Sequence, residues 1–66
     1  MKVKIKRHLP GYYSVTKGDR RVVITERKDR NGWMAMADWD RYLYTDIVPT
    51  YRDAKRNAIL MLEGDL

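Results

Sequence analysis

The middle of the chain, residues 20–39, constrains the fold more than any other part of the sequence. Along residues 20–27 the alternation places Val22 and Ile24 on one face of a strand and the side chains between them on the other. A polar loop follows and ends in Asn31-Gly32, a pair typical of hairpin turns. We therefore expect residues 33–39 to form a second strand that pairs antiparallel with the first.

Which face of this hairpin lies inside is ambiguous from the sequence. Alternation divides the second strand into a Trp/Ala face and a Met/Asp face, made respectively of Trp33, Ala35, Ala37 and Trp39, and of Met34, Met36 and Asp38. Small alanines let a helix approach a sheet closely, which favours the Trp/Ala face as the core. The opposite assignment, with the methionines inside, stays open.

Two shorter strands are predicted before the hairpin. Residues 1–6 alternate between apolar residues and lysine, the pattern of an edge strand protected by charge. Residues 9–11 (Leu-Pro-Gly) predict a turn, residues 12–16 a short strand, and residues 17–19 (Lys-Gly-Asp) a tight reversal. After residue 39 we expect a turn at residues 40–41 and a short irregular strand over residues 42–48.

The last segment predicts an amphipathic helix. Thr50 is suited to cap its first turn, with Asp53 three residues later. One stripe at helical spacing is apolar and contains Tyr51, Ala54, Ala58, Met61 and Leu62, whereas Leu60 falls on the polar side. Gly64 is a plausible stop. The predicted fold is a single α+β domain over residues 1–66, a small antiparallel β-sheet of three to four strands packed on one C-terminal α-helix.

Length and composition narrow the class of protein further. A chain of 66 residues has material for one small core, and without cysteine it has no disulfide, thiolate nucleophile or Cys-ligated metal. No internal apolar run is longer than residues 58–62, which is much shorter than the about 20 residues of a membrane span. We expect a cytoplasmic, intracellular protein with no membrane association.

The chain contains few side chains of the kinds that act in catalysis. The chain has one His and one Ser, and His8 is separated in sequence from Ser14 and from every cluster of carboxylates. Asp38, Asp40 and Asp46 are oxygen donors of the kind that hard cations prefer, but aspartates at strand ends usually cap backbone donors, and we favour that reading. We therefore expect no enzyme activity, no catalytic residue, no metal and no cofactor.

Positive charge is concentrated in the first half of the chain. Residues 1–30 contain ten basic and three acidic residues (net +7), and residues 31–66 contain four basic and six acidic ones (net −2). Basic side chains gathered on a sheet suit a phosphate backbone, because each neutralised phosphate releases counterions. The residues predicted to bind nucleic acid are Lys4, Lys6, Arg20, Arg21, Thr25, Arg27, Lys28 and Arg30. The alternative is a solvated face that only keeps the protein soluble.

A protein interface competes with the nucleic-acid hypothesis. If the tryptophans face the helix, Met34 and Met36 lie on the outer face of the sheet, and together with Leu60 they predict an apolar docking surface. The alternative function is thus a small phage-type adaptor or inhibitor that binds a host protein, or a homodimer.

Two segments resemble a known kind of domain. The sequence Gly-Trp-Met-Ala at residues 32–35 and Thr-Tyr-Arg-Asp-Ala-Lys at residues 50–55 resembles the small three-stranded-sheet-plus-helix domains of AP2-type proteins and of the amino end of phage-type tyrosine integrases. Those domains insert the sheet into the DNA major groove with the helix behind it. The resemblance implies DNA rather than RNA as the partner, with Arg21, Thr25 and Arg27 as the reading residues.

Overall fold

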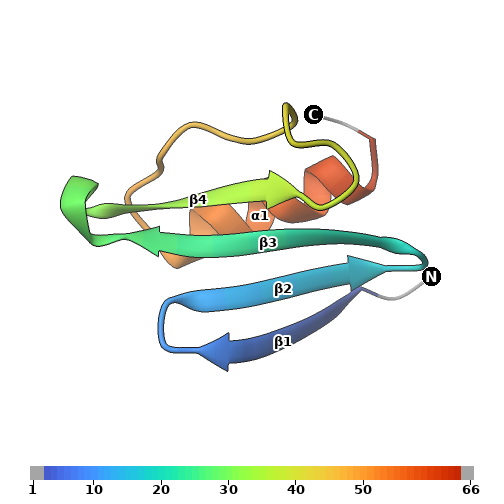
Figure 1. Cartoon of the computed structure of the whole chain (residues 1–66), viewed down its shortest axis with the longest axis horizontal. Coiled ribbons are helices and arrows are strands. Elements are labelled where there is room, and N and C mark those ends of the chain that lie inside the picture. The colour runs from blue at the N-terminus through green and yellow to red at the C-terminus, as the bar shows by residue number, and fades with distance from the viewer. Residues whose placement is uncertain (1–2, 65–66) are drawn as a thin grey trace.

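The computed structural model describes residues 3–64, which form a four-stranded antiparallel sheet and one helix packed on it (Figure 1). The elements in chain order are β1 (Lys4–Leu9), β2 (Tyr12–Lys17), β3 (Arg20–Arg27), the 3₁₀ turn η1 (Lys28–Arg30), β4 (Gly32–Ala37) and α1 (Tyr51–Leu62). The predicted α+β fold is confirmed.

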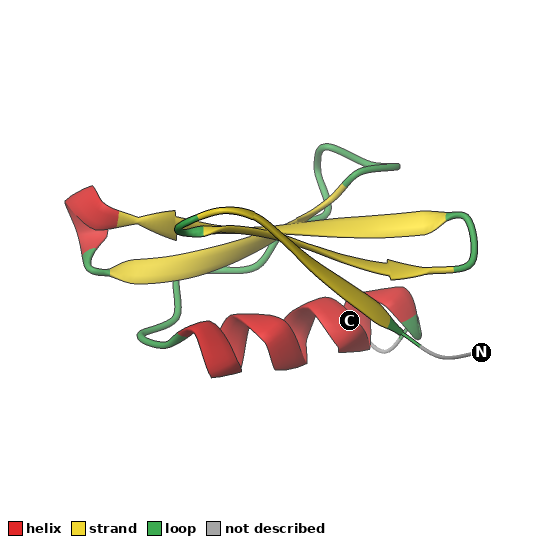
Figure 2. Cartoon of the chain, turned by 90° about the horizontal axis from the view of Figure 1, so that it is seen from below, coloured by secondary structure: helices red, strands yellow, loops and turns green. Residues whose placement is uncertain are grey.

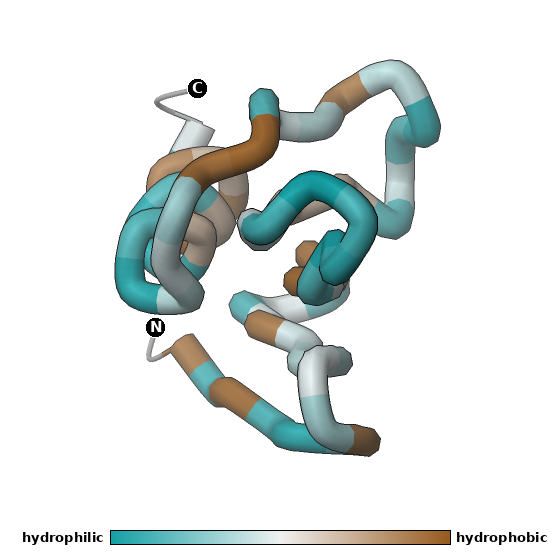
Figure 3. Tube along the Cα trace, turned by 90° about the vertical axis from the view of Figure 1, so that its left-hand side faces the viewer, coloured by the Kyte–Doolittle hydropathy of each residue, from teal (hydrophilic) through white to brown (hydrophobic). Residues whose placement is uncertain are grey.

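The sheet is a meander in which each strand pairs with its neighbours in sequence, in the order β1-β2-β3-β4. Helix α1 covers one face, and the other face has no helix on it in the part that the structure describes (Figure 2). We call the face that packs on α1 the inner face and the opposite one the outer face. Hydrophobic and hydrophilic residues alternate over residues 3–6, at the start of β1 (Figure 3), and every residue of the strand is exposed.

The core lies between the inner face and α1. Val15 and Val22 pair across β2 and β3 and are fully buried, and Ala35 of β4 is buried with Ala54 and Ala58 of the helix. Small side chains on both elements let the helix lie close to the sheet. The prediction of the Trp/Ala face as core is therefore confirmed for Ala35 and Ala37.

The prediction is wrong for Trp39. Strand β4 ends at Ala37, so Trp39 lies beyond the alternation and is 40% exposed. The guanidinium of Arg20 lies over its ring, 5.2 Å from the centroid, and this cation–π contact takes the place of burial.

Three aromatic rings close one end of the core. Tyr51 of α1 lies 4.4 Å from Tyr13 and 5.4 Å from Trp33, measured between ring centroids. Burial, and to a lesser extent Tyr13, raises the pKa of Tyr51 above its usual value of 10.0. This cluster ties the first turn of the helix to β2 and β4.

Several predicted boundaries differ from the structure. Strand β1 runs to Leu9, beyond the predicted residues 1–6, so Leu9 is not in the turn; residues 1–2 lie outside the described residues. Lys17 ends β2 instead of opening the reversal. The predicted hairpin of β3 and β4 is present, and its connection holds η1 and Asn31 in the left-handed region (φ 53°), whereas Gly32, predicted in the loop, is the first residue of β4.

The connection between β4 and α1 runs along the free edge of β4. Two isolated bridges, Met36 with Tyr44 and Trp33 with Val48, replace the predicted irregular strand. Gly32 permits this close approach, because a Cβ there would collide with the side chain of Ile47 and lie 2.8 Å from the carbonyl oxygen of Val48.

Both predicted helix ends are confirmed. The hydroxyl of Thr50 accepts a hydrogen bond from the backbone N–H of Asp53 (3.1 Å), and Gly64 follows the helix with φ 80°. Within residues 3–64, no helix has the length and apolar character needed to cross a membrane.

Candidate nucleic-acid interface

The strand register determines which side chains reach the outer face. Val22 and Ile24 are buried against α1, so Arg21, Val23 and Thr25 point outward from β3. Residues that pair between neighbouring strands form rows across this face. The three rows are Lys4, Thr16 and Arg21; then Lys6, Ser14, Val23 and Met36; and then Tyr12, Thr25 and Met34.

The structure brings together five of the eight residues predicted to bind nucleic acid. Those on the outer face are Lys4, Lys6, Arg21, Thr25 and Arg27. Lys28 and Arg30 lie in η1, at one end of the sheet and on the side away from α1 (Figure 2). Arg20 is the exception, because alternation along β3 places it on the inner side, where it covers Trp39.

Carboxylates neutralise part of this charge. Arg21 pairs with Asp38 at 3.1 Å, and Arg27 with Asp29 at 3.6 Å. Within residues 3–64, no carboxylate forms an ion pair with Lys4 or Lys6. Among the described residues, a carboxylate therefore holds each of the two arginines in place but neither lysine.

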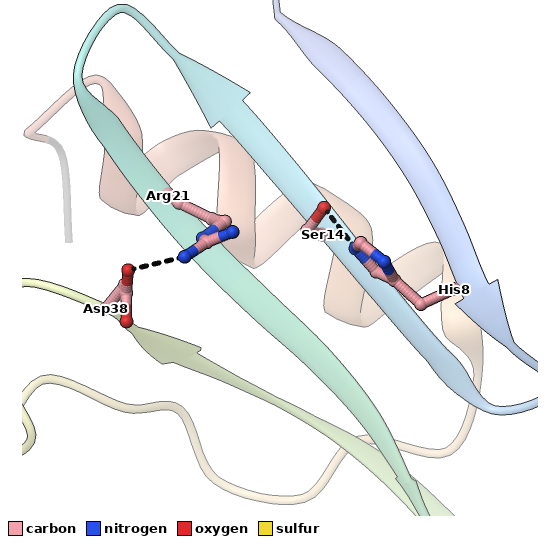
Figure 4. Close-up of polar contacts among 4 residues, drawn as sticks. All are labelled: His8, Ser14, Arg21 and Asp38. Carbon is pink, nitrogen blue, oxygen red and sulfur yellow. Dashed lines mark hydrogen bonds and ion pairs between the residues drawn. The ribbon is translucent and has the colours of Figure 1, made fainter.

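A β-bulge adds a histidine to the outer face. The β1–β2 register shifts between Arg7 and Leu9, and the additional residue, His8, is hydrogen-bonded to Ser14 with 2.9 Å between Nε2 and Oγ (Figure 4). The ring of His8 also meets that of Tyr12 edge-on, with centroids 5.4 Å apart. The sequence separation of His8 and Ser14 thus concealed a direct contact, which only the bulged register reveals.

The Ser14 side of the His8–Ser14 pair is buried. Ser14 is only 4% exposed, so a substrate has little access to its hydroxyl. In the hydrogen bonds of the described residues, no carboxylate accepts from the other nitrogen of His8. The contact therefore fixes the end of β1 against β2.

The three aspartates considered as cation ligands do not converge. Asp38 pairs with Arg21, and Asp40 accepts a hydrogen bond from the backbone N–H of Tyr42 (3.0 Å). No group of three or more metal-ligating side chains occurs within residues 3–64.

A hollow of about 260 Å³ lies on the outer face, across β1, β2 and β3 and beside the end of β4. Leu9, Tyr12 and Val23 give it apolar walls. The two polar pairs, His8 with Ser14 and Arg21 with Asp38, complete its lining (Figure 4). The sequence gives no sign of this hollow, because its residues come from four separate segments.

The residues of the predicted protein interface do not form one surface. Met34 and Met36 lie on the outer face among the basic residues, and Met36 is 40% exposed. Leu60 belongs to α1, which covers the inner face of the sheet (Figure 2), and it lines a depression with Ile59 and Arg56. An apolar outer surface therefore consists of Met34, Met36 and Val23 without Leu60.

A second basic surface lies on the helix. Arg52, Lys55 and Arg56 line the depression beside Leu60, and Arg56 pairs with Asp53 at 3.2 Å. Because this helix surface lies opposite the outer face, changing its charges provides a control for charge changes on the outer face.

Comparisons of the chain with protein-family models, with curated proteins and with solved structures found no match. The assignment of a function therefore depends on the geometry and charge of the outer face.

Proposed function

We propose that this protein binds nucleic acid through the outer face of its sheet. The observation that carries the proposal is the distribution of charge on that face. Lys4, Lys6, Arg21 and Arg27 project from it, and within residues 3–64 the acidic side chains that pair with them are Asp38, with Arg21, and Asp29, with Arg27. Because α1 occupies the inner face, the outer face is open to a large partner.

The spacing of these groups suits a polyanion. Lys4 and Lys6 lie on the edge strand, and Arg27 lies on β3 near the far end of the sheet, where η1 adds Lys28 and Arg30. A partner that crosses the sheet meets positive charge at both margins. DNA is favoured over RNA only through the resemblance of residues 32–35 and 50–55 to sheet-inserting DNA-binding domains.

Mobility-shift titrations with random duplex and single-stranded DNA at two salt concentrations test this proposal. Binding at low salt should weaken steeply as salt rises, because phosphate contacts release counterions. The absence of any shift at low salt with both DNAs refutes the proposal.

Charge reversal identifies the face that binds. Arg21→Glu/Arg27→Glu should abolish binding without unfolding the chain, since both side chains are exposed. The matched variant Arg52→Glu/Lys55→Glu changes the net charge equally on the helix and should retain most binding. The reverse result assigns binding to the helix and contradicts the proposal.

A protein-docking function is the second candidate. Met36 is 40% and Tyr44 56% exposed, and the two residues are bridged beside Val23 on the outer face. Binding of a protein partner through this patch should tolerate salt, in contrast to phosphate contacts.

A further inference from the structure

We infer that the hollow on the outer face is a binding subsite for one unpaired guanine base. The inference rests on the proposed function and names the part of a nucleic acid that the site selects.

The shape and lining of the hollow suit a planar heterocycle. Val23 lies in the centre of the sheet, and Leu9 and Tyr12 stand at one end, where Leu9 is 65% and Tyr12 39% exposed. A base that lies flat over Val23 buries these apolar groups. The rings of His8 and Tyr12 border the same end and offer aromatic surface to the base or its sugar.

The opposite end of the hollow provides a donor and an acceptor side by side. Arg21 donates one hydrogen bond to Oδ2 of Asp38 at 3.1 Å, and the two side chains are 52% and 55% exposed. An ionised carboxylate has about four acceptor positions, so Asp38 can accept further hydrogen bonds while it holds Arg21. The ion pair also orients both groups before a ligand arrives.

Guanine is the base that matches this pair. Its Watson–Crick edge carries two adjacent donors, N1–H and N2–H, for the carboxylate of Asp38. The neighbouring O6 is an acceptor for the guanidinium of Arg21. Adenine, cytosine and thymine each lack the two adjacent donors beside an acceptor. In a duplex this edge is occupied by cytosine, so the site requires an unpaired base.

The surrounding charge favours a base within a strand. Lys6 lies on β1 at the margin of the row that contains Val23, and Arg27 lies further along β3; each can contact a phosphate that flanks the bound base. The subsite therefore adds base selection to a backbone contact that is independent of sequence.

The test measures the affinity of the full chain for labelled oligonucleotides by fluorescence anisotropy. A ~12-residue oligothymidylate is compared with versions that carry one central guanine, inosine or adenine. Guanine should raise the affinity about tenfold, and inosine, which lacks the N2 amine, should lose most of that gain. The corresponding oligouridylates distinguish a ribose from a deoxyribose strand, and the guanine effect in either series supports the subsite.

Two further comparisons distinguish a guanine subsite at Asp38 from nucleic-acid binding without base selection. Asp38→Asn should remove the guanine effect while oligothymidylate binding persists, and Asp46→Asn, the same change on the exposed connection, should retain it. Adding the complementary strand should also abolish the guanine effect. Any one of three results overturns the inference. They are equal affinity for the guanine, inosine and adenine oligonucleotides, a guanine effect that survives Asp38→Asn, and a guanine effect of the same size after the complementary strand is added. The first of these results leaves the proposed function intact, whereas loss of all binding at low salt contradicts both.

Discussion

Replacing Lys4 and Lys6 by glutamine tests the proposed interface most directly. Both side chains project from the edge strand onto the outer face, and within residues 3–64 neither has a carboxylate partner. The exchange therefore breaks no ion pair of the described fold. Its main effect should be the loss of two phosphate contacts.

The expected magnitude follows from counterion release. Each phosphate contact contributes about −0.9 to the slope of log affinity against log salt on duplex DNA, so the Lys4→Gln/Lys6→Gln variant should lose about 1.8 units of slope. Between about 50 and 200 mM salt, the affinity of the unmodified protein should then fall about twelvefold more than that of the variant. On single-stranded DNA the difference in slope should be about 1.4.

The assay is a set of anisotropy titrations at four salt concentrations, with thermal melting to establish that both proteins are folded. The control Arg52→Gln/Lys55→Gln has the same net charge but is altered on the helix. Its slope should match that of the unmodified protein. If the two variants change the slope equally, the effect belongs to overall charge, and the argument for the outer face fails.

Three further changes test the fold that carries this face. Gly32→Ala should lower the free energy of unfolding by roughly 1–3 kcal/mol in a denaturant titration, because the added methyl collides with Ile47 and the backbone of Val48; unchanged stability would contradict the close approach. Thr50→Ala should cost about 1 kcal/mol and lower the melting temperature, whereas Thr50→Ser should keep the cap. Folding raises the pKa of Tyr51, so the contribution of its protonated phenol to stability is fully present below pH 10.0. That contribution is lost as the pH rises through the higher pKa of the folded state. Tyr51→Phe should therefore lose less stability than the unmodified protein between pH 10 and 12, and equal losses would exclude this linkage.

The predictions that depend on local periodicity succeed. Alternation in residues 20–27 identifies β3 with its observed bounds, and Thr50 identifies the start of the helix, because both signals lie within a few adjacent residues. Local periodicity does not predict the end of β4. Its alternation continues in the sequence to Trp39, but the chain leaves the sheet after Ala37, where the connection turns back along the strand.

The hollow could not be predicted, because it depends on register between distant segments. Arg21 and Asp38 are 17 residues apart and meet through the pairing of β3 with β4. His8 reaches Ser14 only because β1 carries a bulge, and no local pattern marks that position. Charge in the sequence thus indicates which half of the chain is basic, whereas the register decides which charges share a face.

The meander has a consequence for how the chain folds. Since β1, β2, β3 and β4 follow one another in both sequence and space, most pairing requires only short loop closures. Contacts of this kind are typical of proteins that fold quickly. We expect the central hairpin of β2 and β3 to form early, with docking of α1 as the later step, since it must bring Ala54 and Ala58 back across the connection to Val22 and Ile24. The outer face would then take shape before the core beneath it is complete.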